Sequence, residues 1–243
     1  MFYLDYEKKA KEIFNLLNSY RKNPKSLAKT LDNLKKHVDK NKVLNEPGKI
    51  PIQMVEGVEV IDEAVNFLNS LKPLNAFELC PYLCQSAKEH VNDIGPKGLL
   101  SYQSSNGTEP EDRISKYGTY VDALGENIDF GPNDAMGVII SLTLDDGEEE
   151  RPHRENLFKS DYRKIGIACG PHKTEYQMCV MDFALDFHPL SNESKNEDAA
   201  RLNNTNKGSK DVYNNNQFQQ NSVNNDKNIK NDVKSNQPQP KRM

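Results

Sequence analysis

The chain has 243 residues and a formal net charge of -4, and 35% of its residues are hydrophobic. Its mean hydropathy of -0.83 is low for a globular domain, so either the whole core is marginal or a polar segment dilutes an ordinary one. The uninterrupted apolar runs are only a few residues long, far short of the roughly 20 that a membrane-spanning helix needs. The composition therefore predicts no transmembrane segment.

A polar segment occupies the C-terminal end of the chain. Residues 189–243 are rich in Asn and Gln, and their aromatic side chains are Tyr213 and Phe218 alone. Such a segment cannot bury enough apolar surface to offset the entropy lost on ordering. We therefore expect one domain over 1–188 and a disordered tail over 189–243.

Because the tail is net basic, the domain is more acidic than the chain as a whole, which argues against a nucleic-acid partner.

The opening residues do not predict a secretory signal. The apolar stretch from Met1 to Leu4 is followed at once by charged residues, whereas a signal needs about 7–15 apolar residues. We therefore expect a cytoplasmic protein, or a secreted one if residues are missing before Met1.

The apolar spacing of the first 94 residues predicts four helices. Asn23-Pro24 is typical of a helix end followed by a new start, because Asn is a good cap and Pro a good first residue. Residues 40–57 are polar, with Pro and Gly among them, and we interpret 38–58 as an inserted loop. The expected helices cover about residues 5–20, 24–38, 58–71 and 76–94.

The second half of the chain predicts fewer helices and one pair of strands. Residues 98–131 are rich in Gly, Ser and Asn and should be mostly loop, with a short helix at 110–117. An apolar helix is expected over 135–144. Two apolar runs at 165–169 and 177–185 are separated by a turn sequence and predict an antiparallel hairpin. Helices first and strands last is an α+β order, in which helices cover a small antiparallel sheet.

The four cysteines are too few for a disulfide scaffold. Cys80 and Cys84 do not have the spacing of a zinc or redox pair. Cys169 and Cys179 flank the predicted hairpin, so we expect their Cα atoms to lie within about 7 Å, the limit for a bridge without backbone movement. In a reducing cytosol they would remain free thiols.

From about Leu79 onward, the sequence contains a series of short motifs: Ala87-x-x-His90-x-x-Asp93, Leu100-Ser-Tyr-Gln-Ser-Ser-Asn-Gly-Thr108, Asp112-Arg-Ile-x-x-Tyr-Gly118, Gly125-Glu-Asn-Ile128, Asp145-Asp-Gly147, Arg151-Pro-His-Arg-x-Asn156, Gly166-Ile-Ala-Cys-Gly170 and Cys179-Val-Met-Asp-Phe183. In this order they resemble the CAP superfamily, the SCP/pathogenesis-related-1 fold, in its bacterial-like SCP form. An N-terminal match, Asn18-x-x-Arg21-x-x-Pro24, precedes them. The resemblance implies an α-β-α sandwich over everything except the tail.

The resemblance also implies a cleft built from two histidines and two acids. It assigns Glu126 to the first acid position, Asp145 or Asp146 to the second, and His153 to one histidine position. The other histidine position is Tyr102 in this chain. A phenol with a pKa near 10 is neutral at pH 7 and a poor zinc ligand, whereas imidazole is a good one. We therefore expect no bound metal and no cofactor.

Two functions follow from this pattern. The first is a non-catalytic CAP domain that binds a lipid or sterol-like ligand or a protein partner, roles that the resemblance implies. The alternative is a hydrolase that uses Glu126, Asp145 and His153 in a degenerate cleft. Each of these residues could instead hold loops together, with His153 paired to Glu126 and Tyr102 bonded to a cleft acid. An open cleft would favour the enzyme, and burial in mutual hydrogen bonds would favour the binding domain.

A similar structural role is expected for polar residues around the cleft. His90 should be a structural histidine on the fourth helix. Asp182, placed at a strand end, and Arg113 should form a pair that fixes the loop layer.

Overall fold

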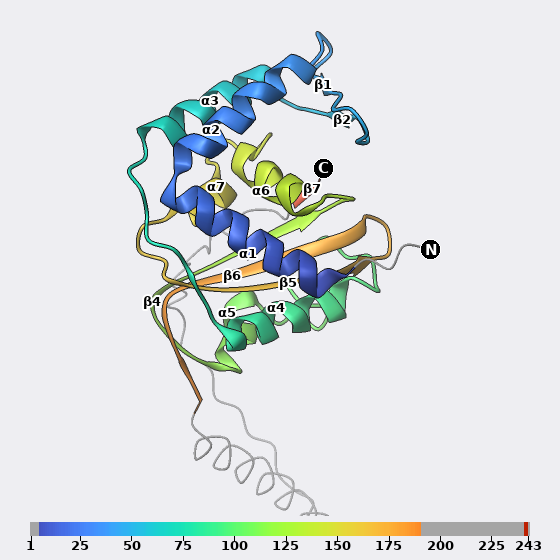
Figure 1. Cartoon of the computed structure of the whole chain (residues 1–243). Helices are drawn as coiled ribbons and strands as arrows, with labels where there is room; N and C mark the ends of the chain where they lie inside the picture. Colours follow the sequence, from blue (N-terminus) through green and yellow to red (C-terminus); the bar gives the residue numbers. More distant parts are fainter. Residues whose placement is uncertain (1–4, 191–240, 243) are drawn as a thin grey trace, which may run out of the picture. The chain divides into compact units, whose positions relative to one another are not determined.

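A computed structural model of the chain describes residues 5–190 and 241–242. The disordered tail expected over 189–243 therefore lies almost entirely outside the described residues. Within the described part, helices lie on both faces of a central sheet (Figure 1). The α-β-α sandwich predicted from the motifs is confirmed.

The N-terminal third folds as three helices, α1 (Tyr6–Lys22), α2 (Pro24–Leu34) and α3 (Val58–Ser70). Asp5 caps α1 by accepting from the Lys8 N–H at 2.9 Å, and Pro24 is the first residue of α2. The second helix ends earlier than expected, and a 3-10 turn, η1 (Lys35–His37), continues it. These helices bury the apolar faces that the spacing predicted.

The inserted loop contains a small hairpin of its own, formed by β1 (Val43–Leu44) and β2 (Ile52–Gln53). The Asp146 carboxylate anchors the C-terminal end of the inserted loop by accepting from the backbone N–H groups of Val55 and Glu56 at 2.7 and 2.8 Å. The Glu56 side chain in turn accepts from Arg151. The insertion is therefore tied to the loop between α6 (Ala135–Leu144) and α7 (Pro152–Phe158).

The central sheet has the strand order β3-β5-β6-β4-β7. The predicted hairpin is confirmed as β5 and β6, which pair antiparallel, and β6 also pairs antiparallel with β4. The two short edge strands pair parallel with their neighbours. The strands are β3 (Glu78–Leu79), β4 (Gly118–Phe130), β5 (Lys164–His172), β6 (Tyr176–Pro189) and β7 (Lys241–Arg242).

The expectation that residues 98–131 would be mostly loop is wrong for its second half. The short helix is present as α5 (Pro110–Ser115), but β4 follows it and pairs with β6 from Gly118↔Pro189 to Phe130↔Met178. The Gly, Asp and Asn residues in this stretch disfavour a strand when considered alone. Pairing with the long apolar strand β6 outweighs that local preference.

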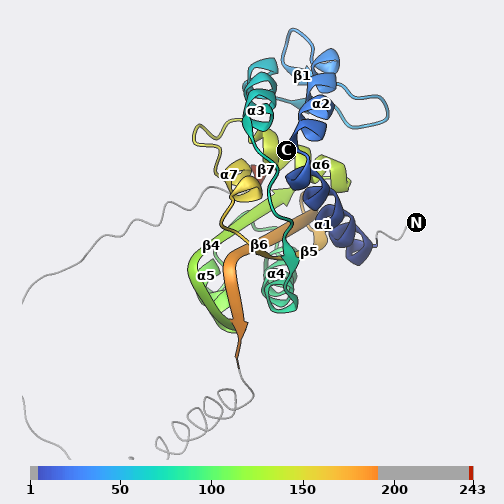
Figure 2. The same cartoon turned by 60° about the vertical axis from the view of Figure 1, so that its left-hand side comes forward.

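Different helices cover the two faces of the sheet. On one face of the sheet lie α4 (Pro81–Ile94) and α5, and on the other lie α1, α6 and α7 (Figures 1 and 2). The expected helix over 135–144 is confirmed as α6, whereas α7 was not predicted. Across residues 5–190 and 241–242, we find no helix that combines the length and the apolarity needed to cross a bilayer.

Alternation along β6 connects the sheet to both layers. Met178 and Val180 pack toward the α4 layer, whereas Cys179 and Met181 pack toward the α1 layer. The α4 helix approaches β5 so closely that a Cβ on Gly166 would lie 2.1 Å from the Leu83 carbonyl carbon. A glycine at this position is thus a condition for the packing of α4.

Cys169 and Cys179 are directly opposite each other on β5 and β6, with Cα atoms 4.1 Å apart. The predicted proximity is confirmed, but the expectation of free thiols is wrong, because the two residues form a disulfide. That expectation came from an assumed reducing compartment. Directly opposed residues in an antiparallel pair approach to about 4.5–5.5 Å between Cα atoms, close enough for a bridge.

Candidate functional site

Three of the four candidate residues form a chain of hydrogen bonds. His153 on α7 contacts the Asp145 carboxylate through Nδ1 at 2.6 Å and the Tyr102 hydroxyl through Nε2 at 2.8 Å. A carboxylate can only accept, so Nδ1 donates to Asp145, and Nε2 of a neutral ring then accepts from the phenol. The order is therefore Tyr102 to His153 to Asp145. The Tyr102 hydroxyl contacts the histidine rather than an acid, contrary to expectation.

Asp145 can accept the hydrogen bond from His153 because it lies where one helix ends and the next begins. It closes α6 in the left-handed conformation, with φ 55°, which Asp tolerates better than most residues. Its carboxylate accepts from the backbone N–H groups of His153 at 2.8 Å and Arg154 at 3.2 Å. The residue at the cap position of α7, Arg151, makes no side-chain cap bond. Asp145 thus caps α7 from a distance and orients His153 at the same time.

The fourth candidate, Glu126 on β4, belongs to a neighbouring cluster. It forms a buried ion pair with Arg113 of α5. Arg113 also donates to the main-chain oxygen of Tyr102 at 3.3 Å and to the Ser104 hydroxyl at 3.1 Å. Arg113 therefore connects Glu126 to Tyr102 and its hydrogen bond with His153. The expected pairing of His153 with Glu126 is wrong, because His153 contacts Asp145 and Tyr102 instead.

Asp182 faces Glu126 from the adjacent strand, in register. It lies in the interior of β6 rather than at a strand end, and the ion pair of Arg113 is with Glu126. Burial raises the pKa of Glu126 well above its usual range, and the neighbouring Asp182 raises it further. Burial likewise raises the pKa of Asp182.

All four candidate side chains are shielded from solvent. Tyr102 is 7% exposed, Glu126 1%, and Asp145 and His153 0%. Burial raises the pKa of the Tyr102 phenol well above 10, which keeps the hydroxyl neutral. The candidates are thus buried in hydrogen bonds and an ion pair instead of lining an open cleft.

The residues at this site do not fit the divalent cation that the family's cleft implies. Both ring nitrogens of His153 are engaged, one by Asp145 and the other by Tyr102. Among residues 5–190, no group of three or more His, Cys, Asp or Glu side chains is arranged to hold a metal ion. A neutral phenol stands where a second nitrogen ligand would be needed.

His90 and Asp146 take structural positions. His90 is fully buried, with Nε2 2.9 Å from the Ser101 carbonyl oxygen. Burial, and then the charge of Arg113, lowers its pKa to about 4. Asp146 anchors the inserted loop, so Asp145 is the acid that contacts His153.

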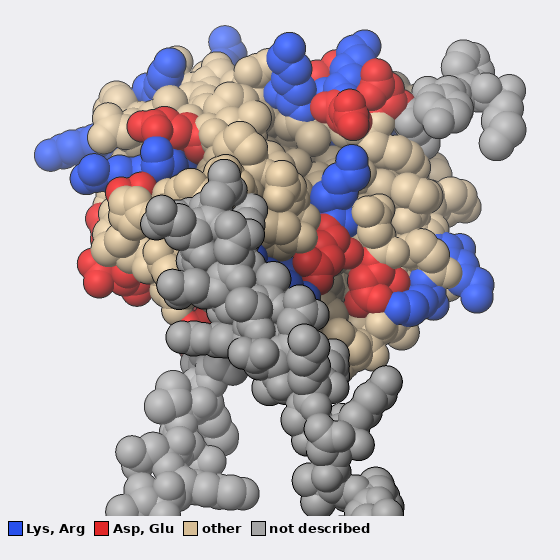
Figure 3. Space-filling view, turned by 90° about the horizontal axis from the view of Figure 1, so that it is seen from below, with Lys and Arg blue, Asp and Glu red and all other residues tan. Residues whose placement is uncertain are grey.

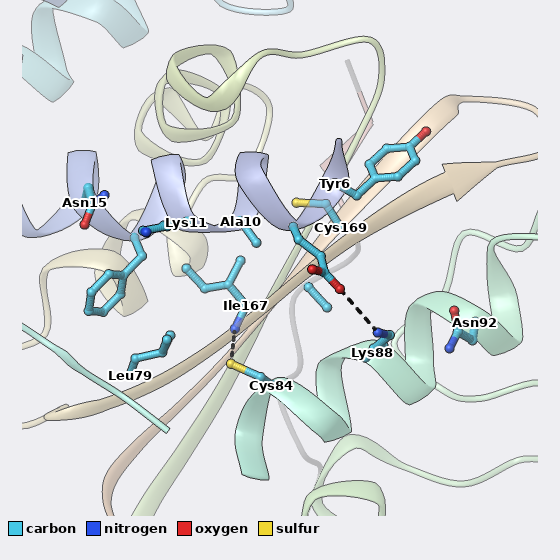
Figure 4. A pocket seen from close by; sticks show the side chains of 13 residues that line it. Tyr6, Ala10, Lys11, Asn15, Leu79, Cys84, Lys88, Asn92, Ile167 and Cys169 are labelled. Atoms are coloured by element: carbon cyan, nitrogen blue, oxygen red, sulfur yellow. Dashed lines mark hydrogen bonds and ion pairs between the residues drawn. The ribbon is translucent and has the colours of Figure 1, made fainter. Parts of the chain in front are cut away.

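A groove that the motifs did not point to lies between α1 and α4, at the edge of β5 (Figure 4). Its volume is about 450 Å³. The groove exists because β3 covers only the start of β5, pairing with Lys164 and Ile165. Its lining residues are Tyr6, Glu7, Ala10, Lys11, Phe14, Asn15, Leu79, Cys84, Lys88, Asn92, Ile167, Ala168 and Cys169.

An α-β-α sandwich with these motifs in this order defines a CAP-domain protein. The family model described as "CAP: Cysteine-rich secretory protein family" matches residues 14–183, and the chain belongs to this family. A search of curated proteins finds no match.

Two solved structures resemble the chain. An outer surface protein from Borrelia burgdorferi is 24% identical, with a TM-score of 0.40 over 52% of this chain and 86% of that one. An extracellular protein containing a SCP domain from Bacillus anthracis str. Ames is 18% identical, with a TM-score of 0.38 over 52% of this chain and 39% of that one.

Proposed function

We propose that this chain is a non-catalytic CAP domain that holds a lipid-like ligand in the groove between α1 and α4. One contrast supports this proposal: the acid and histidine residues are buried in mutual bonds, whereas the apolar groove is open. Its volume falls within the range of about 300–1,000 Å³ that is typical of small-molecule sites.

The lining of the groove favours a single apolar chain with an anionic head. Phe14 and Ala10 of α1 face Ile167 of β5, so the walls are largely apolar. Lys11 and Lys88 line the same groove from the two helices, and Lys88 lies 3.9 Å from the exposed Glu7 across it (Figure 4). An exposed pair at that distance is weak, so a ligand carboxylate can replace Glu7 as the partner of Lys88.

The distribution of charge does not favour a polyanionic partner. On the face drawn in Figure 3, acidic and basic side chains lie side by side over the part that is not covered. The whole chain carries a net charge of -4. A nucleic acid would favour a basic face, so a small ligand or a protein remains the proposed partner.

Binding of fatty acids of increasing chain length tests this proposal. Each methylene buried in the groove contributes about 0.8 kcal/mol, so affinity should rise about fourfold per methylene until the groove is full. Ala10→Phe should abolish binding by filling the groove, and Lys88→Glu should weaken it. Lys8→Glu is the matched control, because Lys8 is on α1 but not in the groove. Unchanged binding by Ala10→Phe would contradict the proposal.

Two further assays address ligand identity and the hydrolase alternative. Mass spectrometry of molecules that co-purify with the full chain should find an acyl chain or a sterol. Esterase and peptidase screens of the same sample should find no turnover. An activity abolished by Glu126→Gln or His153→Ala would establish the hydrolase instead.

The Cys169–Cys179 disulfide also bears on the compartment. Disulfides form and persist in oxidising environments and are rare in the cytosol. We therefore propose the secreted location over the cytoplasmic one that the opening residues led us to expect. Intact-mass analysis of protein from its native source tests this proposal. Two free thiols at these positions would support the cytoplasmic location instead.

A further inference from the structure

Two carboxyl groups face each other in the interior of the sheet, away from the groove. Glu126 on β4 and Asp182 on β6 are in register, and they are 1% and 0% exposed. Side chains directly opposite on antiparallel strands have Cβ atoms about 4.5–5.5 Å apart. Two ionised carboxylates at this separation would repel each other, and burial would disfavour the charge on each.

The groups packed around the pair provide one positive charge. Arg113 on α5 forms an ion pair with Glu126. From α4, the Ser86 hydroxyl and the Cys84 thiol face Asp182, and burial raises the pKa of that thiol. His90 and Tyr102 are neutral at pH 7, because burial lowers the pKa of His90 to about 4 and raises that of Tyr102. One arginine thus faces two acids, which leaves one negative charge in excess.

The two carboxyl groups also have too few hydrogen-bond donors around them. The Oε1 atom of Glu126 and both carboxyl oxygens of Asp182 are buried and lack a hydrogen-bond partner within residues 5–190. The Ser86 hydroxyl faces Asp182, but one hydroxyl can donate to only one of these three oxygens. A buried acceptor without a donor destabilises a fold. A proton on either carboxyl would supply a donor and remove the excess charge together. A metal cation would not fit, because the guanidinium of Arg113 already contacts Glu126.

We propose that Glu126 and Asp182 form a proton-binding site in which the two carboxyl groups share one proton. This proton is a structural part of the fold at neutral pH. It keeps β4 and β6 together at the point where α5 and α4 pack on them. Neither Glu126 nor Asp182 lines the ligand groove.

The sign of the pH dependence follows from proton linkage. The folded pair holds a proton that the unfolded chain, with ordinary carboxyl pKa values, has released. The stabilisation is therefore full below those ordinary values and is lost as the pH rises through the raised pKa of the folded pair. Over that window, the unfolding equilibrium constant increases up to tenfold per pH unit for one proton.

Denaturant unfolding of the full chain between about pH 5 and pH 9 tests the proposal. The wild type should lose stability with rising pH, by up to tenfold per unit in the unfolding constant. Glu126→Gln and Asp182→Asn should each flatten this dependence, because an amide supplies a donor without needing a proton. Asp186→Asn is the matched control, an acid on the same strand whose side chain is 46% exposed, and it should keep the wild-type slope. Equal slopes in all four proteins would overturn the proposal.

A measurement on the wild type keeps the test decisive if an amide variant does not fold. Carbon-13 NMR of the side-chain carboxyl groups distinguishes protonated from ionised acids. One protonated carboxyl should persist in the folded protein at neutral pH and disappear on unfolding. A spectrum in which every carboxyl is ionised at pH 7 would refute the shared proton.

Discussion

Removing the Cys169–Cys179 disulfide should lower the free energy of unfolding by about 2.7 kcal/mol. The two cysteines are 10 residues apart, and a closed loop of that length removes about 9 cal/mol/K of entropy from the unfolded chain. At 25 °C this corresponds to about 2.7 kcal/mol, toward the lower end of measured disulfide effects because the loop is short.

Urea unfolding of the oxidised protein, the reduced protein and a Cys169→Ala/Cys179→Ala variant would measure this value. The reduced protein and the double variant should agree with each other and unfold at lower urea. A Cys80→Ala/Cys84→Ala variant is the control, since these two cysteines are free, and it should respond to reductant as the wild type does. Identical midpoints for oxidised and reduced protein would refute the reasoning.

Four other outcomes can be checked with single variants or short assays. Gly166→Ala should destabilise the fold by about 3 kcal/mol, because its Cβ would lie 2.1 Å from a backbone atom of Leu83; thermal unfolding within a degree of wild type would contradict this. Asp145→Ala should destabilise by about 1–3 kcal/mol, because it removes the acceptor of the His153 and Arg154 N–H groups that caps α7, more than Asp146→Ala does under the same denaturation assay. Tyr102→His should raise zinc affinity in calorimetry, because it places a second imidazole near Nε2 of His153; an unresponsive variant would argue against that geometry. The domain boundary at residue 188 remains a prediction, and limited proteolysis should leave a cooperative core ending near it, whereas loss of folding on deletion of 189–243 would disprove it.

Local patterns predicted most of the helices and fewer of the strands. The fourth helix was expected from about residue 76, but β3 occupies Glu78–Leu79 and α4 begins only at Pro81. The spacing of Ile13 and Leu17 on α1 is a property of one short segment, so it could be read directly. Strand β4 could not be recognised in that way, because Gly118–Phe130 depends on partners about 60 residues later in β6. The seven-residue helix α7 was missed for a related reason, since Asp145 caps it from outside the segment.

The candidate site was predicted as a set of residues but not as a set of contacts. The motifs identified Tyr102, Asp145 and His153, which the fold brings together, while leaving Asp145 and Asp146 as alternatives. They could not indicate that Glu126 faces Asp182, because that contact follows from the register between β4 and β6. The groove carries no motif, since it is a space left uncovered where β3 ends.

Asp145 caps α7, and this role changes what can be concluded from an aspartate beside His153. An acid and a histidine in contact suggest catalysis, yet here the acid closes one helix and starts the next. The requirement to begin α7 is enough to account for Asp145 beside His153 without any catalytic role. Anyone redesigning this domain as an enzyme would first have to cap α7 in another way, so that the histidine could be turned toward a substrate without unravelling the helix that carries it.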